Sequence, residues 1–173
     1  MDALTKVLIV SDTHGLTNEL ITVKERHAVD FMIHCGDSEL EMDDMALKDF
    51  YLVGGNCDFD SRYPDEQTLD IGGLKFFIVH GHLHHVKKDL TALVDEARNR
   101  EAAVICYGHT HAADVTQSEN QLFINPGSIY YPKGMKERTY AILEWDISNE
   151  LRVKFYNLSG ELMKELDYLA NFR

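Results

Sequence analysis

Residues 7–15 read VLIVSDTHG, an apolar run that stops abruptly at polar, turn-prone residues. Four consecutive β-branched or aliphatic side chains predict a strand that is buried on both faces, at the centre of a sheet. Asp12 and His14 follow directly, two positions apart. In an extended segment such side chains point the same way, so a carboxylate and an imidazole are expected to converge.

The segments that follow alternate between strand and helix patterns. Thr17 or Asn18 is placed to cap a helix that continues to about His27. A strand, a short acidic helix and a third strand are then predicted over residues 30–34, 39–48 and 50–53. This alternation favours parallel pairing, with helices covering the sheet.

The second half of the chain introduces antiparallel pairing. Gly72-Gly73 separates two strand patterns at residues 67–71 and 74–80, which is a strong hairpin signal. A helix is predicted over 88–100, and further strands over 103–106, 114–116, 121–124, 139–145 and 151–156. We therefore predict an α/β protein of two sheets packed face to face with helices outside, in a single domain spanning residues 1–173.

Composition excludes several classes of protein. The chain has 173 residues, is 45% hydrophobic and carries a net charge of −12, which argues against disorder and against general nucleic-acid binding. Its three cysteines form no C-x-x-C pair, as expected in a reducing compartment. No signal peptide or membrane-spanning run is evident, so a cytoplasmic protein that does not enter the membrane is expected. A homo-oligomer is left open.

Side chains that commonly bind metals follow five of the predicted strands. They are Asp12, His14, Asp37, Asn56, His80, His109 and His111. Any one of them alone is more often a helix cap, a turn residue or a structural histidine. Together they are expected at the carboxyl ends of the strands, where open α/β sheets form their sites.

The chemistry of this set points to transition metals. Oxygen and nitrogen ligands without a thiolate suit Mn²⁺, Fe, Co²⁺, Ni²⁺ or Zn²⁺. Seven ligands exceed what one ion takes in a catalytic site with open positions. Two ions about 3.5–4 Å apart that share one carboxylate account for the number, and Asp37 is the natural bridge.

The motifs resemble those of the calcineurin-like metallophosphoesterase superfamily, in particular its small bacterial and archaeal phosphodiesterases. They are Asp12-x-His14, Gly36-Asp37, Gly55-Asn56, His80, Gly108-His109-x-His111 and Asn125-Pro126-Gly127-Ser128. The resemblance implies a four-layer α/β/β/α sandwich of two mixed sheets. It also implies that Asp12, His14 and His111 hold one ion. Asn56, His80 and His109 would then hold the other, with Asp37 between them.

The resemblance further implies a metal-dependent hydrolase that acts on a small-molecule phosphate ester. We hypothesise that two divalent ions, with Mn²⁺ favoured, generate a bridging hydroxide that attacks phosphorus. Asp37, Asn56 and His109 are the residues expected to be catalytic. The main interpretation is a phosphodiesterase; a phosphomonoesterase and a non-catalytic scaffold of the same fold are the alternatives.

Cys57 departs from the family pattern, because many members carry a histidine there that is thought to protonate the leaving oxygen. A thiol is a poorer proton donor than an imidazolium, so slow hydrolysis of natural esters is expected unless another group supplies the acid. Asp58 either orients the Asn56 loop or is only a turn residue.

Several other polar residues have a structural or a functional interpretation. His82, His84 and His85 either contact substrate and support the ligands or belong to a solvated loop. His27 and His34 are expected to be structural. The acidic run of Glu39, Glu41, Asp43 and Asp44 is interpreted as the solvated face of a helix.

Overall fold

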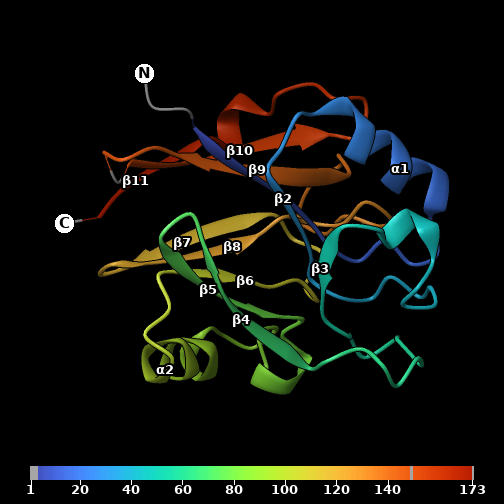
Figure 1. Cartoon of the computed structure of the whole chain (residues 1–173), viewed down its shortest axis with the longest axis horizontal. Helices are drawn as coiled ribbons and strands as arrows, with labels where there is room; N and C mark the ends of the chain where they lie inside the picture. The colour runs from blue at the N-terminus through green and yellow to red at the C-terminus, as the bar shows by residue number, and fades with distance from the viewer. Residues whose placement is uncertain (1–3, 149, 173) are drawn as a thin grey trace.

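The computed structural model describes residues 4–148 and 150–172. A six-stranded and a five-stranded sheet pack face to face. Helix α1 (Thr17–Arg26) covers the first sheet and helix α2 (Thr91–Asn99) covers the second, as Figure 1 shows. The prediction of a four-layer α/β/β/α sandwich of two mixed sheets is confirmed.

The six-stranded sheet has the order β11-β10-β9-β1-β2-β3. Its strands are β1 (Thr5–Val10), β2 (Phe31–His34), β3 (Phe50–Leu52), β9 (Thr139–Trp145), β10 (Glu150–Asn157) and β11 (Tyr168–Asn171). Strands β1, β2 and β3 pair in parallel, as predicted, while β9 pairs antiparallel with β1. The carboxyl ends of β1, β2 and β3 therefore lie at one edge.

The five-stranded sheet has the order β4-β5-β6-β8-β7. Its strands are β4 (Glu66–Ile71), β5 (Leu74–Val79), β6 (Val104–Cys106), β7 (Asp114–Ser118) and β8 (Gln121–Asn125). The predicted hairpin across Gly72-Gly73 joins β4 to β5. Strands β5, β6 and β8 are parallel, so β5 and β6 end at the same edge of this sheet.

Three apolar clusters fill the three interfaces between the four layers. Strand β1 contributes to two of them: Val7 and Ile9 face the other sheet, whereas Leu8 and Val10 face the layer that contains α1. All four side chains are fully buried. The alternation follows from the period of two in a strand.

Some local predictions were wrong. Helix α1 starts at Thr17 with Leu16 at its N-cap and no side-chain cap, so neither Thr17 nor Asn18 caps it. The acidic segment forms only a 3₁₀ turn, η1 (Met45–Leu47), rather than a helix over 39–48. Helix α2 is shorter than the predicted 88–100, and strand β11 was not predicted.

Two observations explain why no acidic helix forms. Glu39 has a φ of +55°, which an α-helix does not accommodate. The Asp44 side chain accepts a hydrogen bond from the amide of Ala46, which favours a capped turn. The acids are therefore not on a helix face: Glu41 and Asp43 remain exposed and pair with Arg62, at 3.5 and 3.0 Å.

Candidate metal centre

The seven ligand-type side chains lie in five loops that follow parallel strands of both sheets. Asp12 and His14 follow β1, Asp37 follows β2, Asn56 follows β3, His80 follows β5, and His109 and His111 follow β6. Five of the seven have positive φ: Asp12, His14, Asp37, His109 and His111. The expectation that Asp12 and His14 converge because their segment is extended was therefore wrong. Their side chains meet through left-handed turns, a conformation that is uncommon for non-glycine residues, although Asp and His adopt it more readily than most.

Backbone hydrogen bonds explain these left-handed turns. The amide of Asp12 donates to Gly36 O and the amide of His14 donates to Asp37 O, each at 3.0 Å. The loop after β1 is thus tied along the loop after β2. The pairing of two loops, rather than the extension of one, brings the carboxylates and imidazoles together.

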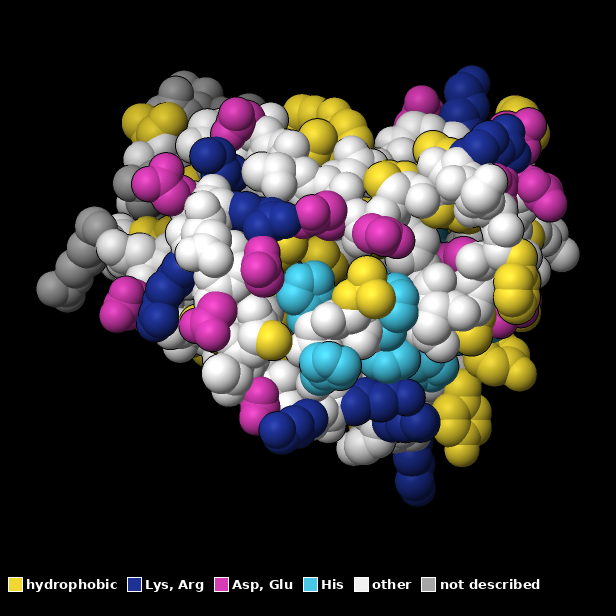
Figure 2. Space-filling model, turned by 90° about the horizontal axis from the view of Figure 1, so that it is seen from below, with side chains coloured by type: hydrophobic (Ala, Val, Ile, Leu, Met, Phe, Trp, Pro, Cys, Tyr) yellow, Lys and Arg dark blue, Asp and Glu magenta, His cyan; other side chains and the backbone are white. Residues whose placement is uncertain are grey.

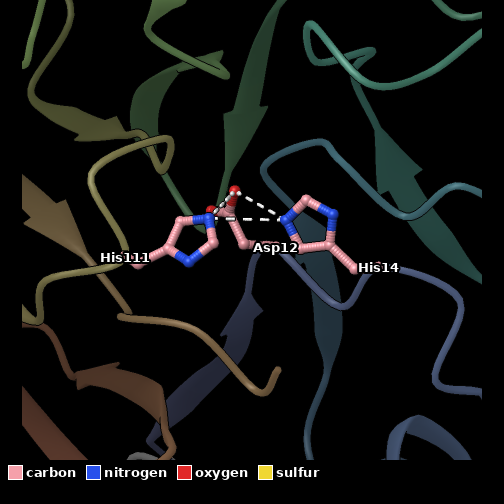
Figure 3. A group of neighbouring side chains, drawn as sticks. All are labelled: Asp12, His14 and His111. Atoms are coloured by element: carbon pink, nitrogen blue, oxygen red, sulfur yellow. Dashed lines mark hydrogen bonds and ion pairs between the residues drawn. The ribbon is translucent and has the colours of Figure 1, made fainter. Parts of the chain in front are cut away.

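Asp12, His14 and His111 form the first group (Figure 3). Asp12 Oδ1 lies 3.1 Å from His111 Nε2 and 3.7 Å from His14 Nε2. The two Nε2 atoms are 3.4 Å apart. Three potential donor atoms therefore face one small volume, as they do around a metal ion.

Asp37, His80 and His109 form the second group, and Asn56 adjoins it. Asp37 Oδ2 and Asn56 Oδ1 each lie 3.1 Å from His80 Nε2. The rings of His80 and His109 are 5.0 Å apart between centroids. The structure thus places Asn56, which follows β3, beside His80, which follows β5 of the other sheet.

The two groups share a boundary at their carboxylates. Asp37 Oδ2 is 3.9 Å from His14 Nε2, and Asp12 Oδ1 is 3.8 Å from His80 Nε2. Each carboxylate thus faces imidazoles of both groups. Asp37 Oδ2 makes its closer contact with His80 of the second group and also lies near His14 of the first group.

Each carboxylate uses its other oxygen to fix its position. Asp12 Oδ2 accepts hydrogen bonds from Ser11 Oγ at 2.6 Å and from the amide of His109 at 3.0 Å. Asp37 Oδ1 accepts one from the amide of Cys57 at 2.8 Å. The oxygens that face the imidazoles are therefore held in place by hydrogen bonds on the opposite side.

One buried oxygen tests whether these residues fit a metal ion. Asp12 Oδ1 is fully buried and has no hydrogen-bond partner within the described residues, although imidazole nitrogens surround it. A buried carboxylate oxygen without a partner is energetically costly. A cation bound there would remove that cost, and the oxygen and nitrogen donor set suits a divalent transition metal.

Backbone carbonyls orient two of the imidazoles. His80 Nδ1 donates to Cys35 O and His111 Nδ1 donates to Tyr131 O, both at 2.7 Å. Because a carbonyl can only accept, Nδ1 carries a proton in both rings. In the neutral ring, Nε2 then keeps its lone pair facing the carboxylates, as a metal ligand requires.

The charges of this cluster shift the pKa values of its members strongly. Contact with Asp12 raises the pKa of His14 to about 9, against the opposing effect of burial. Burial alone would raise the pKa of Asp12, but His111 and His14 outweigh it and hold the pKa well below its usual range. Burial and the charge of His80 lower the pKa of His109 to about 4. Such opposed shifts within a few ångströms are typical of functional sites.

Asp58 joins two of the ligand-bearing loops. Its Oδ2 accepts hydrogen bonds from the amides of Asp37 and Gly55, and its Oδ1 accepts one from the amide of Glu39, each at 2.8 Å. Asp58 therefore does more than form a turn: it fixes the Asn56 loop to the Asp37 loop. The neighbouring Cys57 thiol has its pKa raised to about 11 by burial and by the charge of Asp37.

The histidine tract after β5 divides between the site and the surface. The His82 ring lies 5.4 Å from His80 and 6.0 Å from His109, between centroids. His84 instead packs edge-on against Phe77, and His85 is exposed. Of the three, His82 is the one that the structure brings to the candidate metal ligands. Figure 2 shows histidine side chains gathered on one face of the molecule, beside a group of lysine or arginine side chains.

The remaining histidines make structural contacts. His34 is buried, accepts from the amide of Gly36 at Nδ1 and contacts Thr13 Oγ1 through Nε2 at 2.9 Å. His27 Nε2 lies 2.6 Å from the Tyr140 hydroxyl. Both agree with the structural interpretation.

Two glycines allow the loops to approach closely. A Cβ atom at Gly108 would collide with Ser11 Oγ and lie 2.6 Å from Asp12 Oδ2. One at Gly55 would collide with Asp37 Oδ1 and lie 2.7 Å from the Asp37 amide nitrogen. Both glycines directly abut a candidate metal carboxylate, which no other residue could do at these positions.

The Asn125-Pro126-Gly127-Ser128 motif was quoted for the family resemblance, but no role was predicted for its residues. Ser128 Oγ donates to Asp12 O at 2.8 Å, and Asn125 Nδ2 donates to Gly108 O at 3.2 Å and to Thr110 Oγ1 at 2.9 Å. The motif therefore supports the loops that carry Asp12 and His109 through hydrogen bonds to those loops.

No helix in the described part of the chain is long and apolar enough to cross a membrane. Cys35, Cys57 and Cys106 are all free thiols in the structure.

Comparisons with known proteins relate this chain to a family. Residues 5–148 match the model of the calcineurin-like phosphoesterase superfamily domain. The chain is 44% identical over 162 residues to the probable metallophosphoesterase YsnB of Bacillus subtilis, covering 92% of this chain and 95% of that protein.

Solved structures share the fold. A predicted phosphoesterase from Streptococcus pneumoniae, itself uncharacterised, has a TM-score of 0.92 and 33% identity, covering 97% of this chain and 98% of its own. Vps29 from Entamoeba histolytica, solved in complex with Zn²⁺, has a TM-score of 0.78 and 20% identity, covering 98% of this chain and 100% of its own. The second likeness extends to the fold alone.

Proposed function

The chain belongs to the calcineurin-like phosphoesterase superfamily, and from that premise we propose that it is a dinuclear, metal-dependent phosphodiesterase acting on small organic phosphodiesters. Metal-dependent hydrolysis of phosphoesters is the activity of the family. The observation that carries the proposal is that the seven ligand-type side chains lie in two adjoining groups, one of which contains the unpartnered Asp12 Oδ1.

The ligands divide between two ions. Asp12, His14 and His111 would hold one ion, and Asn56, His80 and His109 the other. Asp37 would lie between them, because its Oδ2 faces imidazoles of both groups. Mn²⁺ suits this mixture of carboxylate, amide and imidazole donors, as do Fe, Co²⁺, Ni²⁺ and Zn²⁺.

When bound, two divalent ions would supply positive charge for the phosphoryl oxygens and lower the pKa of a shared water toward neutrality. The protein's own residues orient the ester. The amide NH₂ of Asn56 is a donor suited to a phosphoryl oxygen, while its Oδ1 faces His80. His82 lies beside His80 and His109, so it can contact the phosphate or its organic group.

The charge of the site supports a diester rather than a monoester. Asp12 and Asp37 offset half of the four positive charges that two divalent ions bring, and Glu39 lies 2.6 Å from His14 at the same site. A phosphodiester carries one negative charge, whereas a monoester carries about two at neutral pH. The single negative charge of a diester is repelled less by the carboxylates of this site than the larger charge of a monoester would be.

Hydrolysis assays with two chromogenic esters test the proposal. The purified protein should hydrolyse bis-p-nitrophenyl phosphate when Mn²⁺ is added, and a chelator should abolish the activity. Faster hydrolysis of p-nitrophenyl phosphate would instead identify a phosphomonoesterase. No metal-dependent rate on either ester would leave a non-catalytic scaffold of this fold.

Substitutions test the residue assignment. Asp37→Ala and His109→Ala should abolish turnover together with binding of at least one ion. His85→Ala is a matched control, because this exposed imidazole lies outside both ligand groups. Wild-type activity in either of the first two variants would refute the assignment of these residues.

A further inference from the structure

Glu39 makes a contact with His14 that differs from those of the neighbouring imidazoles. Its Oε1 lies 2.6 Å from His14 Nδ1, the ring nitrogen that faces away from Asp12. His80 and His111 place the same nitrogen against neutral backbone carbonyls. His14 is therefore the imidazole of these three whose outer nitrogen faces a carboxylate.

The backbone on both sides of this contact is fixed. The amide of Glu39 donates to Asp58 Oδ1 at 2.8 Å, and Glu39 adopts a φ of +55°. The amide of Gly15, next to His14, donates to Ser38 O at 2.7 Å. Two loops that are hydrogen-bonded side by side thus carry the two side chains, which is a stronger constraint than two flexible surface side chains would provide.

The neighbouring acidic residues do not share this role. Glu41 and Asp43 point to Arg62, which also binds Asp60 at 2.7 Å. The contact of Glu39 is thus specific to its position and is not a general property of the acidic segment. Its side chain is 44% exposed and that of His14 only 13%, so the contact closes the outer side of the ligand.

We propose that Glu39 is a positioning residue for the metal ion held by Asp12, His14 and His111; the inference rests on the proposed metal centre. Glu39 accepts a hydrogen bond from His14 Nδ1–H, which keeps the proton on Nδ1 and the Nε2 lone pair facing Asp12 Oδ1, 3.7 Å away. A carboxylate partner also makes the imidazole a stronger donor than a carbonyl does. Glu39 therefore strengthens the binding of the ion held by Asp12, His14 and His111.

Metal binding by variants tests this role without relying on activity. In calorimetric titrations with Mn²⁺, Glu39→Ala should weaken one of the two binding events by about tenfold or more and leave the other within about twofold. Glu39→Gln should weaken that binding event less, because the amide oxygen can still accept a hydrogen bond from His14 Nδ1–H. Glu41→Gln is the matched control and should bind both ions as the unchanged chain does.

A spectroscopic signature separates positioning from a merely structural role. In the Zn²⁺-loaded protein with ¹⁵N-labelled histidine, the Nδ1 proton of His14 should be visible and protected from exchange with water. Glu39→Ala should lose this protection, whereas Glu41→Gln should retain it. Circular dichroism of each variant checks that the fold is intact; if Glu39→Ala does not fold, the comparison between Glu39→Gln and Glu41→Gln decides.

The outcomes distinguish this inference from the proposed function. Unchanged Mn²⁺ affinity and an unchanged His14 signal in the folded Glu39 variants would overturn the role of Glu39 alone. A chain that binds two ions but hydrolyses no ester would refute the proposed function and leave the role of Glu39 to be judged by binding. Absence of metal binding in the unchanged chain would overturn both.

Discussion

Cys57 limits how well this site can protonate a leaving group. The thiol follows Asn56 directly, and burial together with the charge of Asp37 raises its pKa to about 11. An acid that holds its proton so tightly is far from the optimum for general-acid catalysis at neutral pH. Esters with good leaving groups, such as nitrophenol, need little protonation, whereas alkyl esters depend on it.

Cys57→His should therefore accelerate hydrolysis of alkyl phosphodiesters by at least about tenfold, with a much smaller effect on bis-p-nitrophenyl phosphate. The ratio of the two kcat/KM values, measured with saturating Mn²⁺, is the relevant quantity. Cys57→Ser serves as the control, because it changes the side chain without adding an imidazole. A ratio unaffected by the histidine would argue that another group supplies the proton.

His34 is expected to make the folding stability of the protein depend on pH. Burial lowers its pKa from 6.5 to about 4. Because the folded state resists protonation, the unfolded chain binds more protons between these values, and stability is lost as the pH falls from about 6.5 toward 4. This residue is distinct from the proposed metal ligands, since its contacts are with Thr13 and Gly36.

His34→Gln should destabilise the protein at pH 7.5, and the difference from the unchanged chain should shrink by about 2 kcal/mol at pH 5. The expected sign follows because glutamine does not titrate and so lacks the acid-dependent loss. Urea unfolding of both proteins in the presence of a chelator measures it. An equal difference at the two pH values would contradict the linkage.

Residue identities in the candidate site could be predicted from the sequence, but their conformations could not. Asp12, Asp37 and His109 were singled out because they follow apolar strands. Their positive φ values arise from hydrogen bonds between loops that are distant in sequence, such as that from Asp12 N to Gly36 O. Glu39 was assigned to a helix face for the same reason: only its contact with His14, 25 positions away, reveals its place.

At the scale of elements, strand patterns were the most informative. Val7–Val10 was predicted as a central buried strand, and it lies inside its sheet between β9 and β2. The acidic segment was misassigned because its helical pattern is overridden by the positive φ of Glu39 and by a capped turn at Asp44. Local propensity decides where no long-range contact competes with it.

Gly108, between β6 and His109, allows the loop after β6 to lie against the loop after β1. Gly108→Ala should displace the β1 loop, because the added Cβ would collide with Ser11 Oγ beside Asp12. We expect a loss of stability of about 1–3 kcal/mol and a loss of metal affinity in the Asp12 group. Mn²⁺ titration and thermal unfolding measure the two effects separately.

Gly73→Ala is the control for this prediction. Its φ of +84° makes alanine strained, but nothing lies within 4 Å of the added Cβ, and the β4–β5 turn holds no candidate ligand. It should lower stability while leaving metal affinity unchanged. Equal metal affinity in the two variants would show that Gly108 is not required to place Asp12.

At the scale of the whole molecule, the net charge of −12 is compatible with the proposed anionic substrate because the proposed ions would supply positive charge at one place. The proposed ligands of each ion come from both sheets. In the first group, Asp12 and His14 follow β1 while His111 follows β6; in the second, Asn56 follows β3 while His80 follows β5. Metal binding is therefore expected to connect the two halves of the sandwich.

This arrangement leads to a prediction about unfolding, on the proposal that residues 1–173 form one domain. Trp145, the single tryptophan, lies in β9 of one sheet and contacts Phe76 of the other at 5.9 Å between ring centroids. Its fluorescence reports the interface between the sheets, whereas circular dichroism reports all strands. Both signals should follow one coincident thermal transition. Mn²⁺ at about 100 times its Kd should, for each ion bound, stabilise the fold by about 2.7 kcal/mol and raise Tm by about 5–10 °C. Because the proposed ligands of each ion come from both sheets, both signals should shift together. A shift in only one of them would mean that the sheets unfold independently and that the ions do not join them.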